Sequence, residues 1–179
     1  MTVYMTKTWG FDSPSGPLQF RNKGARDRVR AELNLGDLVV IVGTLGDETA
    51  EAERGKILGL MEPTIEPAQS LDFGLRRQPT DFDEHGNYRW PFGLELRRAW
   101  RFTQPWAHFA TYSERRFGME SAQSIVPLLP DEAEAILALP RGLRRWHSKS
   151  AGRSTSSNGN KRSIRRPCPR SAVCVTRSR

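Results

Sequence analysis

The sequence predicts a mixed α/β domain, and three features of the chain support the prediction. Ala25, Val29 and Leu33 recur at i, i+4 and i+8, which places one apolar stripe along a helix. The unbroken apolar run Leu38–Val42, rich in β-branched residues, is typical of a buried strand. Further strands and a second helix follow along the chain. Together these elements favour a curved sheet with two main helices.

The distribution of charge divides the chain into two parts. Of its 28 Lys and Arg residues, ten lie in residues 145–179, which contain no acidic residue. Residues 1–144 therefore hold 18 basic residues against all 20 acidic ones, a net charge of −2. We expect a domain over residues 1–144 and a disordered, basic Ser- and Arg-rich tail over 145–179. Any nucleic-acid surface on the domain must then be a local patch. Whether the tail binds nucleic acid or is the remnant of a truncated or frame-shifted second domain stays open.

Several functional classes find no support in the sequence. No apolar run is long enough to span a membrane, and the N-terminus lacks a signal peptide's apolar region, so we expect a cytoplasmic protein without a membrane partner. Cys168 and Cys174 have no common zinc-site spacing, and His85, His108 and His147 lack paired ligands. No catalytic motif is evident either. We therefore expect a binding protein without cofactor or metal, and not an enzyme.

The elements on either side of the buried strand follow from local patterns. Thr6–Asp12 is predicted to form the first strand, with Trp9 and Phe11 on one face. Lys56–Met61 is predicted to be the strand that pairs with the buried strand. Gly59 within it indicates a bulge or a close backbone approach.

The second half of the domain is predicted less evenly. Pro63–Asn87 shows no clear periodicity and is interpreted as a long, partly ordered connection. Tyr88–Phe102 alternates apolar and polar residues and predicts a strand, with Trp90 at its entry. A short strand is expected around Ile125–Val126. A helix should begin at Pro130, where acidic residues occupy the first turn.

The central stretch resembles a known family. Arg21-Asn22, Ala25-Arg26 and Gly36-Asp37 resemble the R-N-x-x-A-R…G-D core of EVE domains, which belong to the PUA-like superfamily together with YTH domains. The aromatic pair before residue 12 and a serine-bearing strand near residue 124 are similar to the family's first and last strands. The resemblance implies a PUA-like curved sheet or open β-barrel with flanking helices.

The resemblance also implies a function. It suggests a module that recognises a modified nucleobase, with modified cytosine in DNA expected, by flipping the base into an aromatic pocket. Such a module can be the reader of a modification-dependent restriction or defence system, with a separate nuclease partner. Two alternatives stay open, an RNA-binding PUA-like domain and a module that binds a small ligand or a protein.

The expected site combines aromatic walls for the base with arginines for the flanking phosphates. Trp90 is expected to form one wall and Phe20 the opposing wall, with Asn22 reading the edge of the base. The candidate base- and nucleic-acid-binding residues are Trp9, Phe20, Arg21, Asn22, Arg26, Arg30, Thr44, Trp90 and Ser124.

Overall fold

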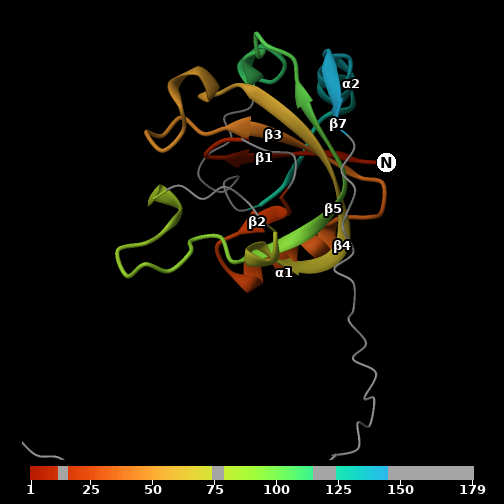
Figure 1. Cartoon of the computed structure of the whole chain (residues 1–179). Coiled ribbons are helices and arrows are strands. Elements are labelled where there is room, and N and C mark those ends of the chain that lie inside the picture. Colours follow the sequence, from red (N-terminus) through yellow and green to blue (C-terminus); the bar gives the residue numbers. More distant parts are fainter. Residues whose placement is uncertain (12–15, 74–78, 115–123, 145–179) are drawn as a thin grey trace, which may run out of the picture. The chain divides into compact units, whose positions relative to one another are not determined.

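The computed structural model describes residues 1–11, 16–73, 79–114 and 124–144 (Figure 1). These residues belong to one compact unit, Met1–Ser148. The predicted disordered tail, residues 145–179, lies outside the described ranges. Within those ranges, no helix is long and apolar enough to cross a membrane.

One mixed sheet organises the described part of the chain (Figure 1). Its strand order is β2-β5-β4-β3-β1-β6, and β7 pairs with the far half of β5. β1 and β3 run parallel, whereas the other neighbours are antiparallel. The sheet is open, and two helices accompany it, so the predicted mixed α/β class is confirmed. The elements are β1 (Val3–Thr8), β2 (Leu18–Phe20), α1 (Lys23–Glu32), β3 (Leu38–Gly43), β4 (Ile57–Gln69), β5 (Phe92–Phe102), β6 (Val126–Pro127), α2 (Pro130–Leu137) and β7 (Arg141–Arg144).

The predicted helix, turn and buried strand are confirmed as α1, the turn after it and β3. The side chain of Asn22 caps α1 by accepting a hydrogen bond from the backbone N–H of Ala25 at 2.8 Å. The carboxylate of Asp37 accepts hydrogen bonds from the backbone N–H groups of Asn34 and Thr2, at 2.9 and 2.7 Å. These bonds fix the turn and align the start of β1 with β3.

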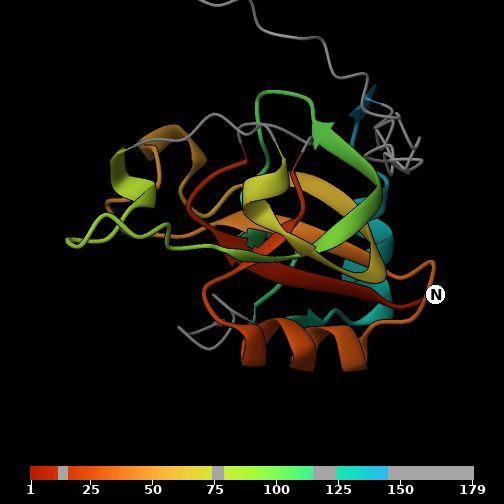
Figure 2. The ribbon, with the colours of Figure 1, turned by 60° about the horizontal axis from the view of Figure 1, so that its bottom comes forward.

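Both faces of the sheet are covered. Val39 and Ile41 of β3 pack in a core cluster with α1, whereas Val40 and Val42 pack in a second cluster with Ile136 of α2. Successive strand residues point to opposite faces, so an uninterrupted apolar run is what a strand buried on both sides requires. Figure 2 shows α1 lying along one side of the sheet.

The first strand is placed differently from the prediction. β1 covers Val3–Thr8 and its pairing with β3 ends at Thr8, so Trp9 and Phe11 follow the strand and do not share one of its faces. The ring of Phe11 is buried against Gly59, where an added Cβ would lie 2.2 Å from a ring carbon. The β3–β4 register also shifts beside Gly59, between Ile41 and Val42, so the predicted bulge is confirmed, while the close approach comes from the Phe11 side chain and not from a backbone.

The long connection predicted over Pro63–Asn87 is wrong in its first part. β4 continues to Gln69 and pairs with β5 beyond the predicted end at Met61. Its prolines, Pro63 and Pro67, lie at irregularities in the β4–β5 register. Proline is tolerated there because the missing N–H is not needed for the regular ladder.

The predictions for the end of the domain hold with small shifts. The short strand is β6, which starts at Val126 and pairs with β1. The second helix begins at Pro130, as predicted, and the backbone N–H before it, that of Leu129, donates to the Glu132 carboxylate at 2.9 Å. Ile136 is fully buried and Leu137 partly buried.

Candidate functional site

Two tryptophans from distant parts of the sequence meet beside the sheet. Trp9 directly follows β1, and Trp90 lies two residues before β5. Their ring centroids are 5.0 Å apart and the ring planes stand at 88°, an edge-to-face contact. Both side chains are half-buried. The rings therefore form two perpendicular walls, which we call the aromatic corner.

Arg89 adds a positive charge to the aromatic corner. Its guanidinium carbon lies 5.9 Å from the centroid of the Trp9 ring. Its Nε donates to the carbonyl of Phe82 at 2.9 Å, and its backbone N–H donates to the carbonyl of Asp81 at 2.8 Å. The cation is thus held in place over one face of Trp9. No pattern in the sequence marks Arg89, although it directly precedes Trp90.

The loop that carries Arg89 and Trp90 is built by its own hydrogen bonds. The carboxylate of Asp83 accepts from the backbone N–H groups of Asn87 and His85, at 2.8 and 2.9 Å. These bonds, first of all the one from the Asn87 backbone, lower the pKa of Asp83 below its ordinary value. Gly86 permits the turn with φ 77°. This part of the predicted partly ordered connection therefore has a defined hairpin-like structure.

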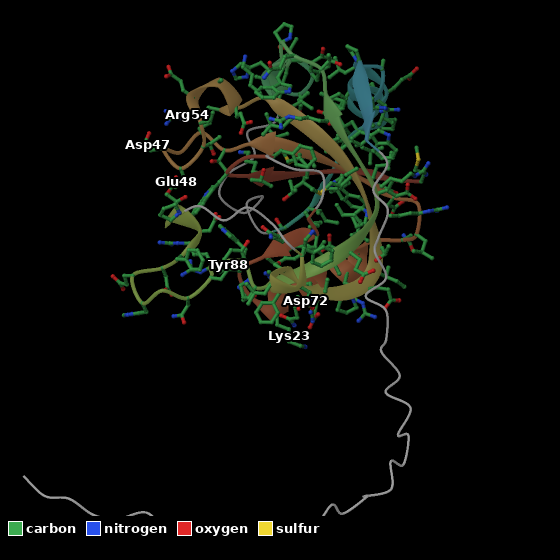
Figure 3. All side chains as sticks on the ribbon, viewed as in Figure 1. Lys23, Asp47, Glu48, Arg54, Asp72 and Tyr88 are labelled. Atoms are coloured by element: carbon green, nitrogen blue, oxygen red, sulfur yellow. The ribbon has the colours of Figure 1, made fainter. Side chains whose placement is uncertain are left out.

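A second aromatic contact lies within the same loop, and a hydrogen bond from it ties the loop to the sheet. Phe82 and Tyr88 pair across the loop, with ring centroids 5.7 Å apart. The Tyr88 hydroxyl accepts a hydrogen bond from Nε2 of Gln19 in β2 at 3.1 Å. Figure 3 labels Tyr88 at the base of the loop that carries Arg89 and Trp90. This loop is consequently anchored to the sheet at its base.

Two of the predicted base-binding residues have structural roles. The ring of Phe20 is 3% exposed and packs in the core cluster beneath α1, so it cannot be the open wall opposite Trp90, and that prediction is corrected. The side-chain oxygen of Asn22 caps α1, but the residue is exposed. Asn22 therefore stays a predicted reader of the base edge.

Arg26 is also a packing residue. It is 6% exposed, and its Nε and Nη2 atoms donate to one carboxylate oxygen of Asp27, at 2.9 and 2.7 Å. Its guanidinium carbon lies 5.7 Å from the centroid of the Phe92 ring. A guanidinium buried between a carboxylate and a ring is not open to a phosphate, which corrects the predicted phosphate contact of Arg26.

The other two candidate arginines lie on the surface near α1. Arg30 is exposed, and its Nε donates to the carbonyl of Ile65 in β4 at 2.7 Å, a bond that links α1 to the sheet. Arg21 is exposed just before the helix. Arg21 therefore stays a predicted phosphate contact, while Arg30 has a structural bond in addition.

Thr44 and Ser124 lie on either side of β1. The backbone N–H of Thr44 donates to the carbonyl of Thr8, the residue before Trp9, at 2.9 Å. Its hydroxyl shares a hydrogen bond with the hydroxyl of Thr49. The carbonyl of Ser124 accepts from the hydroxyl of Thr6 at 2.9 Å. Thr44 is thus placed at the end of β1, beside the residue that precedes Trp9, and Ser124 further back along the strand.

A buried carboxylate near the aromatic corner escaped the sequence analysis. Glu53 is 8% exposed, and its Oε1 accepts from Nη2 of Arg101 at 3.1 Å. A Cβ added to Gly10, the residue after Trp9, would lie 3.1 Å from the other carboxylate oxygen. The guanidinium of Arg101 also lies 5.0 Å from the Trp106 ring centroid. The polar segment 45–55 looks like an ordinary acidic loop in the sequence, so nothing local marked Glu53.

Comparisons with known proteins add little beyond this geometry. No family model matches the chain, and no curated protein does. A crystal structure from Pseudomonas putida has 15% identity and a TM-score of 0.43, covering 76% of this chain and 97% of that one. A hypothetical protein from Leishmania major has 17% identity and a TM-score of 0.40, covering 76% of this chain and 92% of that one. Likenesses at this level carry no functional argument.

Proposed function

We propose that this chain is a nucleic-acid-binding module that recognises a modified base, with modified cytosine in DNA as the expected target. The observation that carries the proposal is the aromatic corner, in which Trp9 and Trp90 stand at 88° with Arg89 beside them. Aromatic side chains bind bases by stacking, whatever the base, and a neighbouring arginine suits the attached phosphate.

Stacking offsets much of the free-energy cost of flipping a base. Arg89 covers one face of Trp9, so we infer that the flipped base stacks on Trp90 and meets the edge of Trp9. Stacking contributes roughly 1–3 kcal/mol per base. Flipping a base out of a duplex costs a few kcal/mol. The two are comparable, so hydrogen bonds to the base edge and contacts to the modification decide which base is accepted.

Asn22 stays our proposed reader of the base edge. Asn22 is exposed and lies two residues after Phe20, which pairs with Phe92, two residues after Trp90. A side-chain amide carries both donors and an acceptor, so it can hydrogen-bond to the edge of a base that stacks on Trp90.

We place the chain, on the resemblance of its central stretch, in the PUA-like group, with the open sheet as a variant of the PUA-like sheet. In the biological role that follows, the module reads modified DNA for a restriction or defence system. Cleavage would then belong to a separate nuclease partner.

Binding titrations with matched oligonucleotides test the proposal. Four probes of one sequence, DNA and RNA with and without a modified cytosine, are titrated against the full chain, and a modified-adenine pair is added. We expect the modified-cytosine DNA to bind at least tenfold more tightly than its unmodified counterpart. A preference for RNA would support the RNA-binding alternative. Equal affinity for all probes would contradict base recognition.

A further inference from the structure

A second cluster, away from the aromatic corner, holds two arginines on one buried carboxylate. Glu62 of β4 is 2% exposed. Nε of Arg98 lies 2.6 Å from one of its carboxylate oxygens, and Nη1 of Arg97 lies 3.2 Å from the other. The arginine side chains themselves are 54% and 66% exposed. One internal carboxylate therefore fixes two guanidinium groups at the surface.

An irregularity in the sheet explains why Arg97 and Arg98, which are adjacent in sequence, both face solvent. In the β4–β5 ladder Glu62 pairs with Arg98, whereas the next residue, Pro63, pairs with Leu96. Arg97 is the extra residue on β5. A bulge redirects side chains that would otherwise alternate across the sheet. Both arginines consequently lie exposed although they are adjacent in sequence.

Trp100 and Arg141 extend the cluster onto β7. The guanidinium carbons of Arg98 and Arg141 lie 5.3 and 5.8 Å from the centroid of the Trp100 ring. Nη1 of Arg141 also donates to the carbonyl of Leu137, near the C-terminal end of α2, at 3.2 Å. Figure 1 shows β7 running beside α2. We call the exposed Arg97, Arg98 and Arg141, together with the half-buried Trp100, the arginine surface.

The charge of the arginine surface is opposite in sign to that of the domain. Two of its three arginines share the single carboxylate of Glu62 and the third, Arg141, lies beside Trp100, whereas residues 1–144 together have a net charge of −2. β7 leads in sequence directly into residues 145–179, with their ten basic residues. Positive charge is therefore concentrated at this point of the chain.

We propose that the arginine surface is a second nucleic-acid contact, which binds backbone phosphates without regard to sequence or modification. Guanidinium groups bind phosphate oxygens through paired hydrogen bonds. The contacts with Glu62 and Trp100 orient the three guanidinium groups before a ligand binds. Fixing the side chains beforehand reduces the entropy lost on binding. The nucleic-acid partner rests on the proposed function, and an acidic protein is the competing occupant. The run of basic residues after β7 favours the phosphate backbone, because such runs commonly bind nucleic acid.

The test measures how DNA binding depends on salt concentration in a variant that keeps the ion pair between Arg98 and Glu62. In Arg97→Gln/Arg141→Gln, Arg98 still neutralises Glu62, so the fold should persist, and a melting curve checks this. Unmodified duplex DNA is titrated into the full chain at several salt concentrations. Each lost phosphate contact lowers the slope of log K against log[salt] by about 0.9, so we expect a decrease of about 2. Modified and unmodified duplexes should weaken by the same factor.

A matched control removes an arginine from an acidic region. Arg54 pairs with the exposed Asp47 at 3.1 Å, and Figure 3 places Glu48 nearby. Arg54→Gln should leave the salt slope unchanged. A further variant, Glu62→Gln/Arg98→Gln, removes the carboxylate and its closest arginine together, so that no buried charge is left unpaired. Its melting curve and salt slope are measured in the same way.

The possible outcomes separate the two proposals. A folded Arg97→Gln/Arg141→Gln variant with the wild-type slope and affinity would overturn the arginine surface as a nucleic-acid contact and leave an acidic protein as its partner. Equal binding of modified and unmodified duplexes by the wild type would overturn base recognition alone, since the slope on unmodified duplex still tests the surface. No binding of any duplex by the wild type would overturn both.

Discussion

Replacing Trp90 with alanine tests whether its ring serves a ligand or the fold. The ring is half-buried and contacts Trp9 edge-to-face at 5.0 Å. Such a pair is worth about 0.5–1.5 kcal/mol beyond the area it buries. Because Trp90 keeps part of its surface in water, we expect Trp90→Ala to cost about 1–2 kcal/mol of unfolding free energy. A tryptophan in the core would cost about 3–5 kcal/mol.

Trp90→Ala should weaken binding by more than it lowers stability, and it should do so only for the modified duplex. Loss of one base stack removes roughly 1–3 kcal/mol, which corresponds to about 5- to 150-fold in affinity. Only a flipped base stacks on Trp90, so the modified duplex should lose this factor while the unmodified duplex changes little. The ratio of the two affinities should fall to about one.

Thermal melting followed by circular dichroism and paired binding titrations measure the two effects on the same samples. Trp90→Phe is the matched control, because it retains an aromatic face and should retain most of the preference. A cycle of Trp9→Ala, Trp90→Ala and the double variant isolates the contact between the rings. Trp90 would be a core residue and not a pocket wall if Trp90→Ala lost about 3–5 kcal/mol of stability and, once folded, still preferred the modified duplex.

Four further predictions follow from the packing, the loop and the charge. Gly59→Val should destabilise the fold by several kcal/mol in denaturant titrations, because an added Cβ would lie 2.2 Å from the ring of Phe11; wild-type stability would contradict the packing. Arg26→Ala should cost about 1–3 kcal/mol of stability and leave the affinity of the folded protein for duplex DNA unchanged; the reverse result would restore its phosphate role. The lowered pKa of Asp83 means that its carboxylate stabilises the fold above the ordinary value of 3.8, and this contribution is lost as pH falls through the lower folded value. Asp83→Asn should therefore flatten the acid end of a plot of stability against pH, and an unchanged plot would contradict this. Removing residues 145–179 should preserve a cooperative unfolding transition while weakening all duplexes alike with a shallower salt slope; loss of the transition would show that the segment belongs to the fold.

Local sequence patterns predicted the helices and strands whose formation depends on residues nearby in the sequence. The stripe of α1 and the apolar run of β3 each reflect burial set by neighbours within a few residues, so periodicity was sufficient. The ends of β1 and β4 depend on partners elsewhere in the chain. β1 stops at Thr8 because its pairing with β3 ends at Gly43, and β4 continues past Pro63 because β5 offers a partner with a bulge. No window of the sequence contains that information.

The same distinction between local sequence and tertiary contacts applies to the candidate site. Trp90 could be proposed from the proline after it and the strand that follows, but its contact with Trp9 depends on how the end of β1 lies against the start of β5. Phe20 and Arg26 were assigned to binding because their burial depends on α1 covering the sheet. Glu53 was missed because only the tertiary structure places its carboxylate beside Gly10.

β5 connects the two proposed surfaces and keeps them apart. Trp90 precedes its first residue, Phe92, while Arg98 follows the bulge, about 20 Å further along the strand at roughly 3.3 Å per residue. That separation exceeds the screening length of about 8–10 Å at physiological salt. Changes at sites this far apart usually add in free energy. If both proposals hold, the arginine surface should set affinity for any duplex and the aromatic corner should set the preference, and a combined variant should lose both independently.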